Sequence, residues 1–376
     1  MVEKNGILPA GKKKVVVGMS GGVDSSVTAL LLKQQGYDVI GLFMRNWEYG
    51  IKGSQCPNRI EFEDAKKVGE LIGIEVLGKD FVEEYRTKVF DVFLEGLKKG
   101  LTPNPDILCN REIKFNVFLN EAKKMGADVI ATGHYAKIAK YKDHYVLDTP
   151  KDSSKDQSYF LHALSSEQLS HAMFPLGDLT KKEVREIARL HNLPVSDKKD
   201  STGICFIGNQ RFDEFITQHL KAIPGDIVDE NGKVLGRHKG LICYTLGQRK
   251  GIGLGGIKET ETANHIHNPW YAAKKNMEDN TLTVVQDTNH PLLMNQSVEA
   301  SHMHWVLEEA PKVGDKLMAQ IRYRQQKQAC TVTEVTGDKV LVQFDKPQRA
   351  VTLGQSLVLY EGDYCLGGGF ISNYYA

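Results

Sequence analysis

The sequence predicts an α/β fold with a doubly wound parallel sheet, followed by a small β-rich central domain and a C-terminal β-barrel. Buried-strand patterns at 15–17, 38–44, 74–77 and 128–135 alternate with helical patterns, which is typical of a parallel sheet covered by helices. A glycine-rich turn between the first strand and the first helix is a second indication. From Pro224 onward, short alternating strands and glycine turns replace the long helices, and this change predicts the β-rich part of the chain.

The glycine-rich turn has the composition of a phosphate-binding loop. Its residues are Gly18, Met19, Ser20, Gly21, Gly22, Val23, Asp24 and Ser25. Backbone N–H groups in such a turn point at an anion, and the dipole of the following helix favours negative charge there. A Walker loop and the pattern G-x-G-x-x-G are both absent. The motif S-G-G-V-D-S instead resembles the PP-loop of the ATP pyrophosphatases; a glycine turn that only lets the helix pack on its strand is the alternative.

The helical patterns that separate the predicted strands are regular. They run from Val27 to Gly36, over 62–72 and over 81–98. Thr180 and Glu183 have the spacing of a capping box, which predicts a further helix that begins there.

Met44 and Gly133 both lie at the carboxyl ends of predicted strands. Ligands of doubly wound sheets bind beyond these ends. We therefore expect both residues to converge with the glycine-rich turn on one nucleotide.

The composition limits the class of protein. A chain of 376 residues is long enough for two or three domains. The formal net charge is only +1, so any nucleic-acid surface must be local. The leader lacks the apolar run of a signal peptide, and no stretch approaches the roughly 18 apolar residues of a membrane helix. The six cysteines show no C-x-x-C spacing, so we expect a cytoplasmic protein with free thiols and no membrane association.

Two cysteine-bearing stretches are candidates for chemistry. In 102–110, two prolines predict a stiff loop between helices that fixes Asp106 and Cys109. A carboxylate three residues from a thiol can move protons beside a nucleophile; the alternative is an N-P-D turn with a cysteine packed beneath it. In 200–208, Cys205 lies between glycines, and two interpretations stay open: an exposed thiol on a loop, or a core thiol at a strand end.

Two stretches are basic and contain no acidic residue. One runs from Lys233 to Lys258 with six lysines and arginines, and the other runs from Lys316 to Thr333 with four. On a predicted strand over Lys316–Arg324, Arg322 and Arg324 share one face, where both can meet phosphate. A solvated basic face is the alternative.

Taken together, these stretches resemble one family. The motifs are S-G-G-V-D-S, L-F-M-R-N-W, N-P-D-I-L-C-N, A-T-G-H-Y-A, K-D-Q-S-Y-F-L, S-T-G-I-C-F-I-G and Y-T-L-G-Q-R-K-G-I-G. Their order and content are similar to the tRNA-specific 2-thiouridylases of the MnmA/TrmU family over nearly the whole chain. The resemblance implies an ATP-dependent tRNA sulfurtransferase that makes 2-thiouridine at the wobble uridine, with release of AMP and pyrophosphate.

The resemblance also implies roles for individual residues. Gly18 to Ser25 would hold the phosphates of ATP, accompanied by Mg²⁺, and Met44 and Gly133 would contact the rest of the nucleotide. Cys205 would carry sulfur as a persulfide, with Cys109 as its partner nucleophile and Asp106 as acid and base. The target base would meet Asn104, Pro105 and Asp106. The tRNA would touch Lys155, Asp156, Gln157, Arg322 and Tyr323.

The implied partners are the anticodon region of tRNA and a persulfide donor, such as a cysteine desulfurase or a sulfur-relay protein. The predicted division is a PP-loop catalytic domain at 1–213, a connector at 214–288 and an RNA-contacting barrel at 289–376.

Three competing interpretations use the same residues. Cys109, Cys205 and Asp106 would hold an iron–sulfur cluster in the first, although their spacing is unusual for one. The second is another PP-loop ligase that adenylates a carboxylate, which needs no cysteine pair. The third is a nucleotide-regulated RNA-binding module without catalysis.

Overall fold

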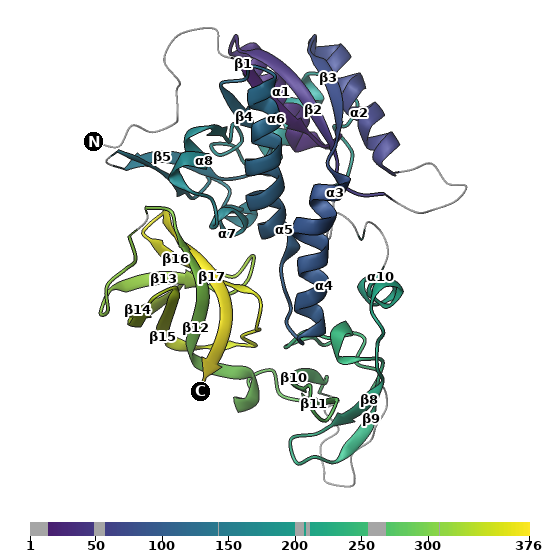
Figure 1. Ribbon diagram of the computed structural model, residues 1–376, viewed down its shortest axis with the longest axis vertical. Helices are drawn as coiled ribbons and strands as arrows, with labels where there is room; N and C mark the ends of the chain where they lie inside the picture. The colour runs from purple at the N-terminus through teal and green to yellow at the C-terminus, as the bar shows by residue number, and fades with distance from the viewer. Residues whose placement is uncertain are drawn as a thin grey trace.

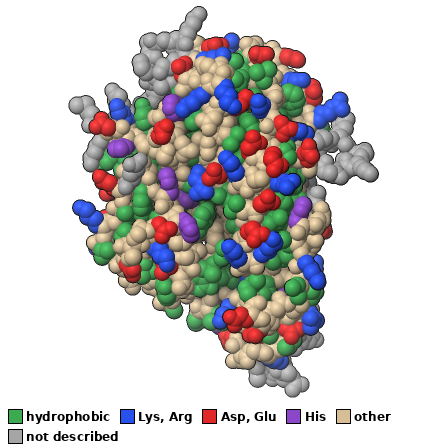
Figure 2. Space-filling view, in the orientation of Figure 1, with side chains coloured by type: hydrophobic (Ala, Val, Ile, Leu, Met, Phe, Trp, Pro, Cys, Tyr) green, Lys and Arg blue, Asp and Glu red, His purple; other side chains and the backbone are tan. Residues whose placement is uncertain are grey.

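The computed structural model describes three connected parts, a parallel α/β domain, a small connector with a mixed sheet and a barrel (Figure 1). The residues described are 14–48, 57–141, 143–199, 207, 211–254, 268–307 and 309–376. Figure 2 shows basic and acidic side chains interspersed over one face of the molecule, in keeping with the net charge of +1.

The first part is the predicted doubly wound sheet. Its strand order is β3-β2-β1-β4-β7, and every pairing is parallel. The strands are β1 (Lys14–Met19), β2 (Asp38–Arg45), β3 (Glu75–Asp80), β4 (Val129–Ala131) and β7 (Ala172–Met173). Val15, Val16 and Val17 are fully buried because helices cover both faces of the central strand. The chain order reverses between β1 and β4, which makes their carboxyl ends the switch point of the sheet.

The predicted helices are present, and the one formed by α3 (Val82–Tyr85), η1 (Arg86–Phe90) and α4 (Asp91–Lys98) contains a π-helical segment. The other segments are α1 (Val23–Gln34), α2 (Pro57–Ile72) and α9 (Lys181–Leu190). The capping box before α9 is confirmed: the Glu183 backbone N–H donates to the Thr180 hydroxyl, and the Thr180 backbone N–H donates to the Glu183 carboxylate.

A second continuous helix corrects the expected loop around Cys109. It consists of α5 (Pro105–Leu108), η2 (Cys109–Val117) and α6 (Phe118–Lys124). The Asn104 side chain caps it by accepting from the backbone N–H of Asp106 at 3.0 Å, and Pro105 at the first helical position is pre-set for a helix. Asp106 and Cys109 therefore lie in a helix rather than in a loop.

The C-terminal part is a closed six-stranded barrel, as predicted. Its strands are β12 (Met294–Trp305), β13 (Lys316–Gln320), β14 (Gln328–Thr336), β15 (Lys339–Arg349), β16 (Ser356–Glu361) and β17 (Tyr364–Tyr375). A hairpin of the first part, β5 (Lys137–Tyr141) and β6 (His144–Asp148), extends this sheet because β6 pairs with β17.

The connector carries one small sheet, β10-β11-β8-β9. Its strands are β8 (Gly225–Val228), β9 (Val234–His238), β10 (Tyr271–Asn276) and β11 (Thr281–Val285). The remaining short helices are η3 (Ser153–Lys155), α7 (Ser158–Leu161), α8 (Ser166–Ser170), α10 (Phe212–His219), η4 (Leu241–Cys243) and η5 (Pro291–Leu293).

The barrel docks on α7 through buried hydrogen bonds. Ser356 is the centre of this contact. Its carbonyl accepts from the Tyr159 hydroxyl at 3.1 Å, and its hydroxyl lies 3.0 Å from Nε2 of His162. The burial of these groups fixes the barrel against the domain that carries the glycine-rich turn.

Candidate nucleotide and thiol site

The glycine-rich turn lies at the switch point of the sheet, between the carboxyl ends of β1 and β4. Gly133 follows β4 and packs directly on the start of α1: a Cβ there would lie 2.9 Å from the backbone nitrogen of Ser25. A larger residue would push β4 and α1 apart. The structure thus brings together Gly133 and the turn, as expected from the sequence.

Hydrogen bonds within the turn fix its shape. The Ser25 hydroxyl accepts from the backbone N–H of Ser20 at 3.1 Å, and the Ser26 hydroxyl donates to the carbonyl of Gly22 at 2.8 Å. Gly22 is the N-cap of α1 and has no side chain to cap it. The N–H groups of the first helical turn therefore lack the usual side-chain acceptor, which suits them to an anion.

Gly21 is required at its position for two reasons. Its φ is +69°, and a Cβ there would lie 2.2 Å from the carbonyl oxygen of Glu61. The chain passes close to α2 at this point, and only glycine permits both the conformation and the approach.

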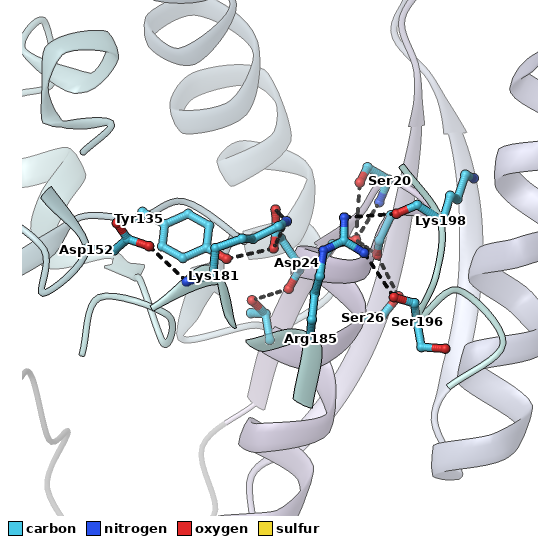
Figure 3. Close-up of polar contacts among 12 residues, drawn as sticks. Ser20, Asp24, Ser26, Tyr135, Asp152, Lys181, Arg185, Ser196 and Lys198 are labelled. Carbon is cyan, nitrogen blue, oxygen red and sulfur yellow. Dashed lines mark hydrogen bonds and ion pairs between the residues drawn. The ribbon is translucent and has the colours of Figure 1, made fainter. Parts of the chain in front are cut away.

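Two lysines from the end of the domain hold the turn in place, and no motif in the sequence predicts them. Lys181 Nζ lies 2.7 and 2.8 Å from the carboxylate oxygens of Asp24, which also accepts from the Tyr135 hydroxyl at 2.9 Å (Figure 3). Lys198 Nζ donates to the carbonyl of Gly21 at 2.9 Å. The signal in the sequence is weak, because 157 positions separate Lys181 from Asp24.

Met44 connects the turn to the region around Cys109. A Cβ at Gly18 would lie 3.5 Å from Cε of Met44 and 3.6 Å from the ring of Phe118. Met44 also packs against the hydrophobic cluster that contains Cys109. The residues predicted to bind the nucleotide and the cluster of Cys109 therefore both border Met44.

Asp106 and Cys109 occupy the start of the helix that Asn104 caps. Cys109 is 2 % exposed. Burial raises the pKa of the Asp106 carboxyl, while the nearby charge of Lys114 lowers it. A carboxyl whose pKa is moved toward neutrality is suited to proton transfer.

Cys205 lies outside the described residues. Ile207, two positions further on, is described and buried, and it belongs to the same hydrophobic cluster as Cys109.

Lys114 and His134 form a second polar pair, which the sequence alone does not predict. Lys114 Nζ lies 3.4 Å from Nε2 of His134, whose Nδ1 lies 2.7 Å from the Thr132 hydroxyl oxygen. Burial places the pKa of His134 well below its ordinary value, and Lys114 lowers it further. His134 is neutral as a consequence.

The K-D-Q segment packs against the A-T-G-H-Y-A segment. The Gln157 side chain accepts from the backbone N–H of Tyr135 at 2.9 Å, and the backbone N–H of Gln157 donates to the Tyr135 carbonyl at 2.9 Å. Asp156 accepts from the backbone N–H of Ser158 at 2.9 Å, and Lys155 is half-buried at the end of η3. Gln157 and Asp156 thus have structural contacts in addition to any contact with RNA.

Arg322 and Arg324 do not share a strand face, which corrects the expectation from the sequence. β13 ends at Gln320, and Arg324 lies in a turn with a φ of +64°. The Arg322 guanidinium donates to the carbonyl of Ala350 at 2.6 Å and is half-buried, whereas Arg324 is exposed. The chain reverses direction here, so the alternation of a strand no longer applies.

Tyr323 faces the α/β domain. Its ring centroid lies 4.2 Å from that of Phe160, which places Tyr323 at the seam between the barrel and α7.

No helix in the described part of the chain is long and apolar enough to cross a membrane. Within the same residues, no group of three or more His, Cys, Asp or Glu side chains is arranged to hold a metal ion.

Comparisons with known proteins cover nearly the whole chain. The family described as tRNA methyl transferase HUP domain matches residues 13–209, the tRNA methyl transferase PRC-barrel domain matches 213–286, and the aminomethyltransferase beta-barrel domain matches 295–371. These matches and the strand topology confirm the predicted fold class.

Two curated relatives are full-length matches. The chain is 86% identical over 362 residues to tRNA-specific 2-thiouridylase MnmA 2 of Aliarcobacter butzleri, covering 96% of this chain and 99% of that protein. It is 49% identical to tRNA-specific 2-thiouridylase MnmA of Methylobacillus flagellatus, with the same coverage. Among solved structures, a 4-thiouridine synthetase–RNA complex with bound ATP has a TM-score of 0.36 at 16% identity, covering 55% of this chain and 50% of that chain. That likeness is too low to support an argument.

Proposed function

This chain belongs to the tRNA-specific 2-thiouridylase family and is a tRNA sulfurtransferase that makes 2-thiouridine; we propose that it adenylates the wobble uridine with ATP and then transfers a persulfide sulfur. The observation that carries this proposal is the meeting of two features. The glycine-rich turn and the helix of Asp106 and Cys109 flank Met44 at the carboxyl end of the sheet.

ATP fits the turn at the switch point. Gly18 to Ser25 supply backbone N–H groups at the uncapped start of α1. Gly133, after β4, faces the start of α1 and has no side chain that would occupy this space. Met44 borders the same space. Mg²⁺ bound to the phosphates would screen their charge. Pyrophosphate, as the leaving group, stays on the N–H groups of the turn.

The first step activates a poor leaving group. The C2 oxygen of the uracil attacks the α-phosphorus, forming an oxygen–phosphorus bond, while the bond to pyrophosphate breaks. Asp106 accepts the N3 proton, for which its raised pKa suits it. Asn104 and Pro105 place the base next to that carboxylate.

The second step transfers sulfur. The terminal sulfur of a Cys205 persulfide attacks C2, and AMP leaves with the electron pair of the carbon–oxygen bond. The Cys109 thiolate then attacks Sγ of Cys205, which forms a Cys109–Cys205 disulfide and leaves the outer sulfur on C2. A cellular thiol reduces the disulfide, and a persulfide donor protein reloads Cys205.

The placement of Ile207 supports this pairing. Ile207 is buried in the hydrophobic cluster of Cys109, and it follows Cys205 by two positions in the sequence.

The RNA-facing residues are proposed from the same resemblance. The anticodon region of tRNA would contact the seam between the barrel and α7. The proposed domains are 1–213, 214–288 and 289–376, and the proposed location is the cytoplasm. The contacts would come from Lys155, Asp156, Gln157, Arg322 and Tyr323.

A single-turnover assay with tRNA, ATP and a persulfide donor tests the proposal. We expect AMP, pyrophosphate and 2-thiouridine from the wild type, and a Cys109–Cys205 disulfide by peptide mapping when reductant is omitted. Cys109→Ser and Cys205→Ser should bind ATP and tRNA but make no 2-thiouridine. Cys243→Ser, in the connector, is the matched control and should remain active. ADP and phosphate as main products, or normal thiolation by Cys205→Ser, would refute the mechanism; an unaffected Cys109→Ser would favour a ligase that acts on a carboxylate.

A further inference from the structure

Lys114 lies between the residues proposed for the nucleotide and the residue proposed for the base. It extends from η2, and its Nζ lies 3.4 Å from Nε2 of His134, directly after Gly133. Asp106 lies at the start of the same continuous helix, and the charge of Lys114 lowers the pKa of that carboxyl. The Lys114 ammonium group is therefore linked to both parts of the site, by a hydrogen bond to His134 and by its charge to Asp106.

The hydrogen bonds of His134 show how the ammonium is held. An ammonium has three donors and no acceptor, so Nε2 of the neutral His134 must accept from Lys114. The ring hydrogen is then on Nδ1 and donates to the Thr132 hydroxyl at 2.7 Å. Phe115 and Phe174 surround the ring, with centroids at 6.0 and 5.9 Å, which fixes its orientation.

A neutral histidine orients the ammonium without cancelling its charge. A surface lysine in an ion pair, such as Lys124 with Glu121 at 3.3 Å, is partly neutralised by its partner. Lys114 instead has a neutral hydrogen-bond partner in His134, and it lies beside the switch point of the sheet, where the start of α1 already favours anions.

We propose that Lys114 is a catalytic residue of the adenylation step, where its ammonium group, held by His134 next to Gly133, contacts the α-phosphoryl group. This inference rests on the proposed function. As the C2 oxygen attacks the α-phosphorus and pyrophosphate departs, the ammonium neutralises the charge that develops on the α-phosphoryl oxygens. The N3 proton moves to Asp106, and Lys114 keeps its own protons throughout.

The proposal predicts a specific pattern of kinetics. Lys114→Met preserves the length of the side chain and removes the charge; we expect the single-turnover rate of pyrophosphate release to fall by about 10²-fold, the size typical of losing one preorganised charge donor. ATP affinity should change by much less. Lys114→Arg should restore most of the rate.

The pH profile separates this role from a structural one. Asp106 works as a base, so the rate falls on the acid side as its carboxyl is protonated. Lys114 is the charged group that acts on Asp106 in the described part of the chain, and Cys109 lies one helical turn further on. Removal of the lysine raises the pKa of Asp106, and the acid limb should therefore move to higher pH.

Lys124→Met, on the same helix and 75% exposed, is the matched control and should leave rate and profile unchanged. A Lys114→Met enzyme with a normal rate and an unmoved acid limb would overturn the proposal, as would a rate loss explained entirely by weaker ATP binding. If Lys114→Met fails to fold, Lys114→Arg provides the test. A variant that keeps the rate of pyrophosphate release and the acid limb of its pH profile supports the role of the charge, and a variant that loses both overturns it. A wild-type enzyme that releases no AMP would instead refute the proposed function itself.

Discussion

Replacing Gly21 by alanine tests whether the phosphate-binding turn depends on both its conformation and its close approach to α2. The φ of +69° costs an L-residue about 1–2 kcal/mol. The new Cβ would also lie 2.2 Å from the Glu61 carbonyl oxygen, and relief of such an overlap typically costs about 1–3 kcal/mol. The free energy of unfolding should therefore fall by roughly 2–5 kcal/mol.

Gly36 provides the matched control. It has a similar φ of +85°, but a Cβ there would meet no atom within 4 Å. Gly36→Ala should lose only the conformational part, about 1–2 kcal/mol. Urea unfolding of both variants measures the difference, and calorimetry should show weaker ATP binding for Gly21→Ala alone. Equal destabilisation of the two variants would refute the reasoning, because the contact with Glu61 would then contribute nothing.

Three further predictions concern charged residues. Arg324→Ala should flatten the slope of log tRNA affinity against log salt by roughly 0.7–0.9 if this exposed side chain contacts one phosphate. Arg322→Ala should lower the unfolding midpoint, since the Arg322 guanidinium donates to the Ala350 carbonyl. An unchanged midpoint would contradict that structural role. The hydrogen bonds of Glu183 to Lys151 and Thr180 lower its pKa to about 2. Because the folded pKa lies below the unfolded value, the stability contributed by Glu183 is present above about pH 4.5 and is lost as the pH falls toward 2. Glu183→Gln should therefore be less stable than wild type at pH 7, with the difference closing over that acid range in thermal melts; a constant difference would contradict the linkage.

Local patterns predicted much of the fold. The valine run of β1 is buried where parallel strands are buried on both faces, and the Thr180–Glu183 capping box marks the start of α9. Both signals involve neighbours in sequence, and tertiary packing does not oppose them.

The start of the helix at Asn104 has a signal in the sequence. An Asn cap with proline at the first helical position is a helix-start signature, whereas the stiff loop is expected only when the two prolines are considered without the cap. Asp106 occupies the first turn of this helix, where the dipole favours a carboxylate.

The polar contacts of the site could not be predicted in the same way. Lys181 reaches Asp24 across 157 positions, and Lys114 meets His134 where the neighbouring Phe115 of η2 packs against the His134 ring. At Arg322 the local pattern predicts a structure that the chain does not form: the sequence continues the pattern of a strand, but the chain turns at Ile321. Such contacts depend on the assembled fold rather than on local spacing.

The pairing of β6 with β17 has a consequence for how this enzyme can be divided or recombined. Tyr364 and Cys365 of the barrel register with Asp148 and Leu147 of the α/β domain, so a single sheet crosses the boundary between them. A truncated protein that ended before the barrel would expose β6 as an unprotected edge and invite aggregation. Exchange of the barrel between related enzymes should therefore succeed only when the hairpin of β5 and β6 is exchanged with it. The smallest exchangeable unit is then the barrel together with this hairpin of the α/β domain.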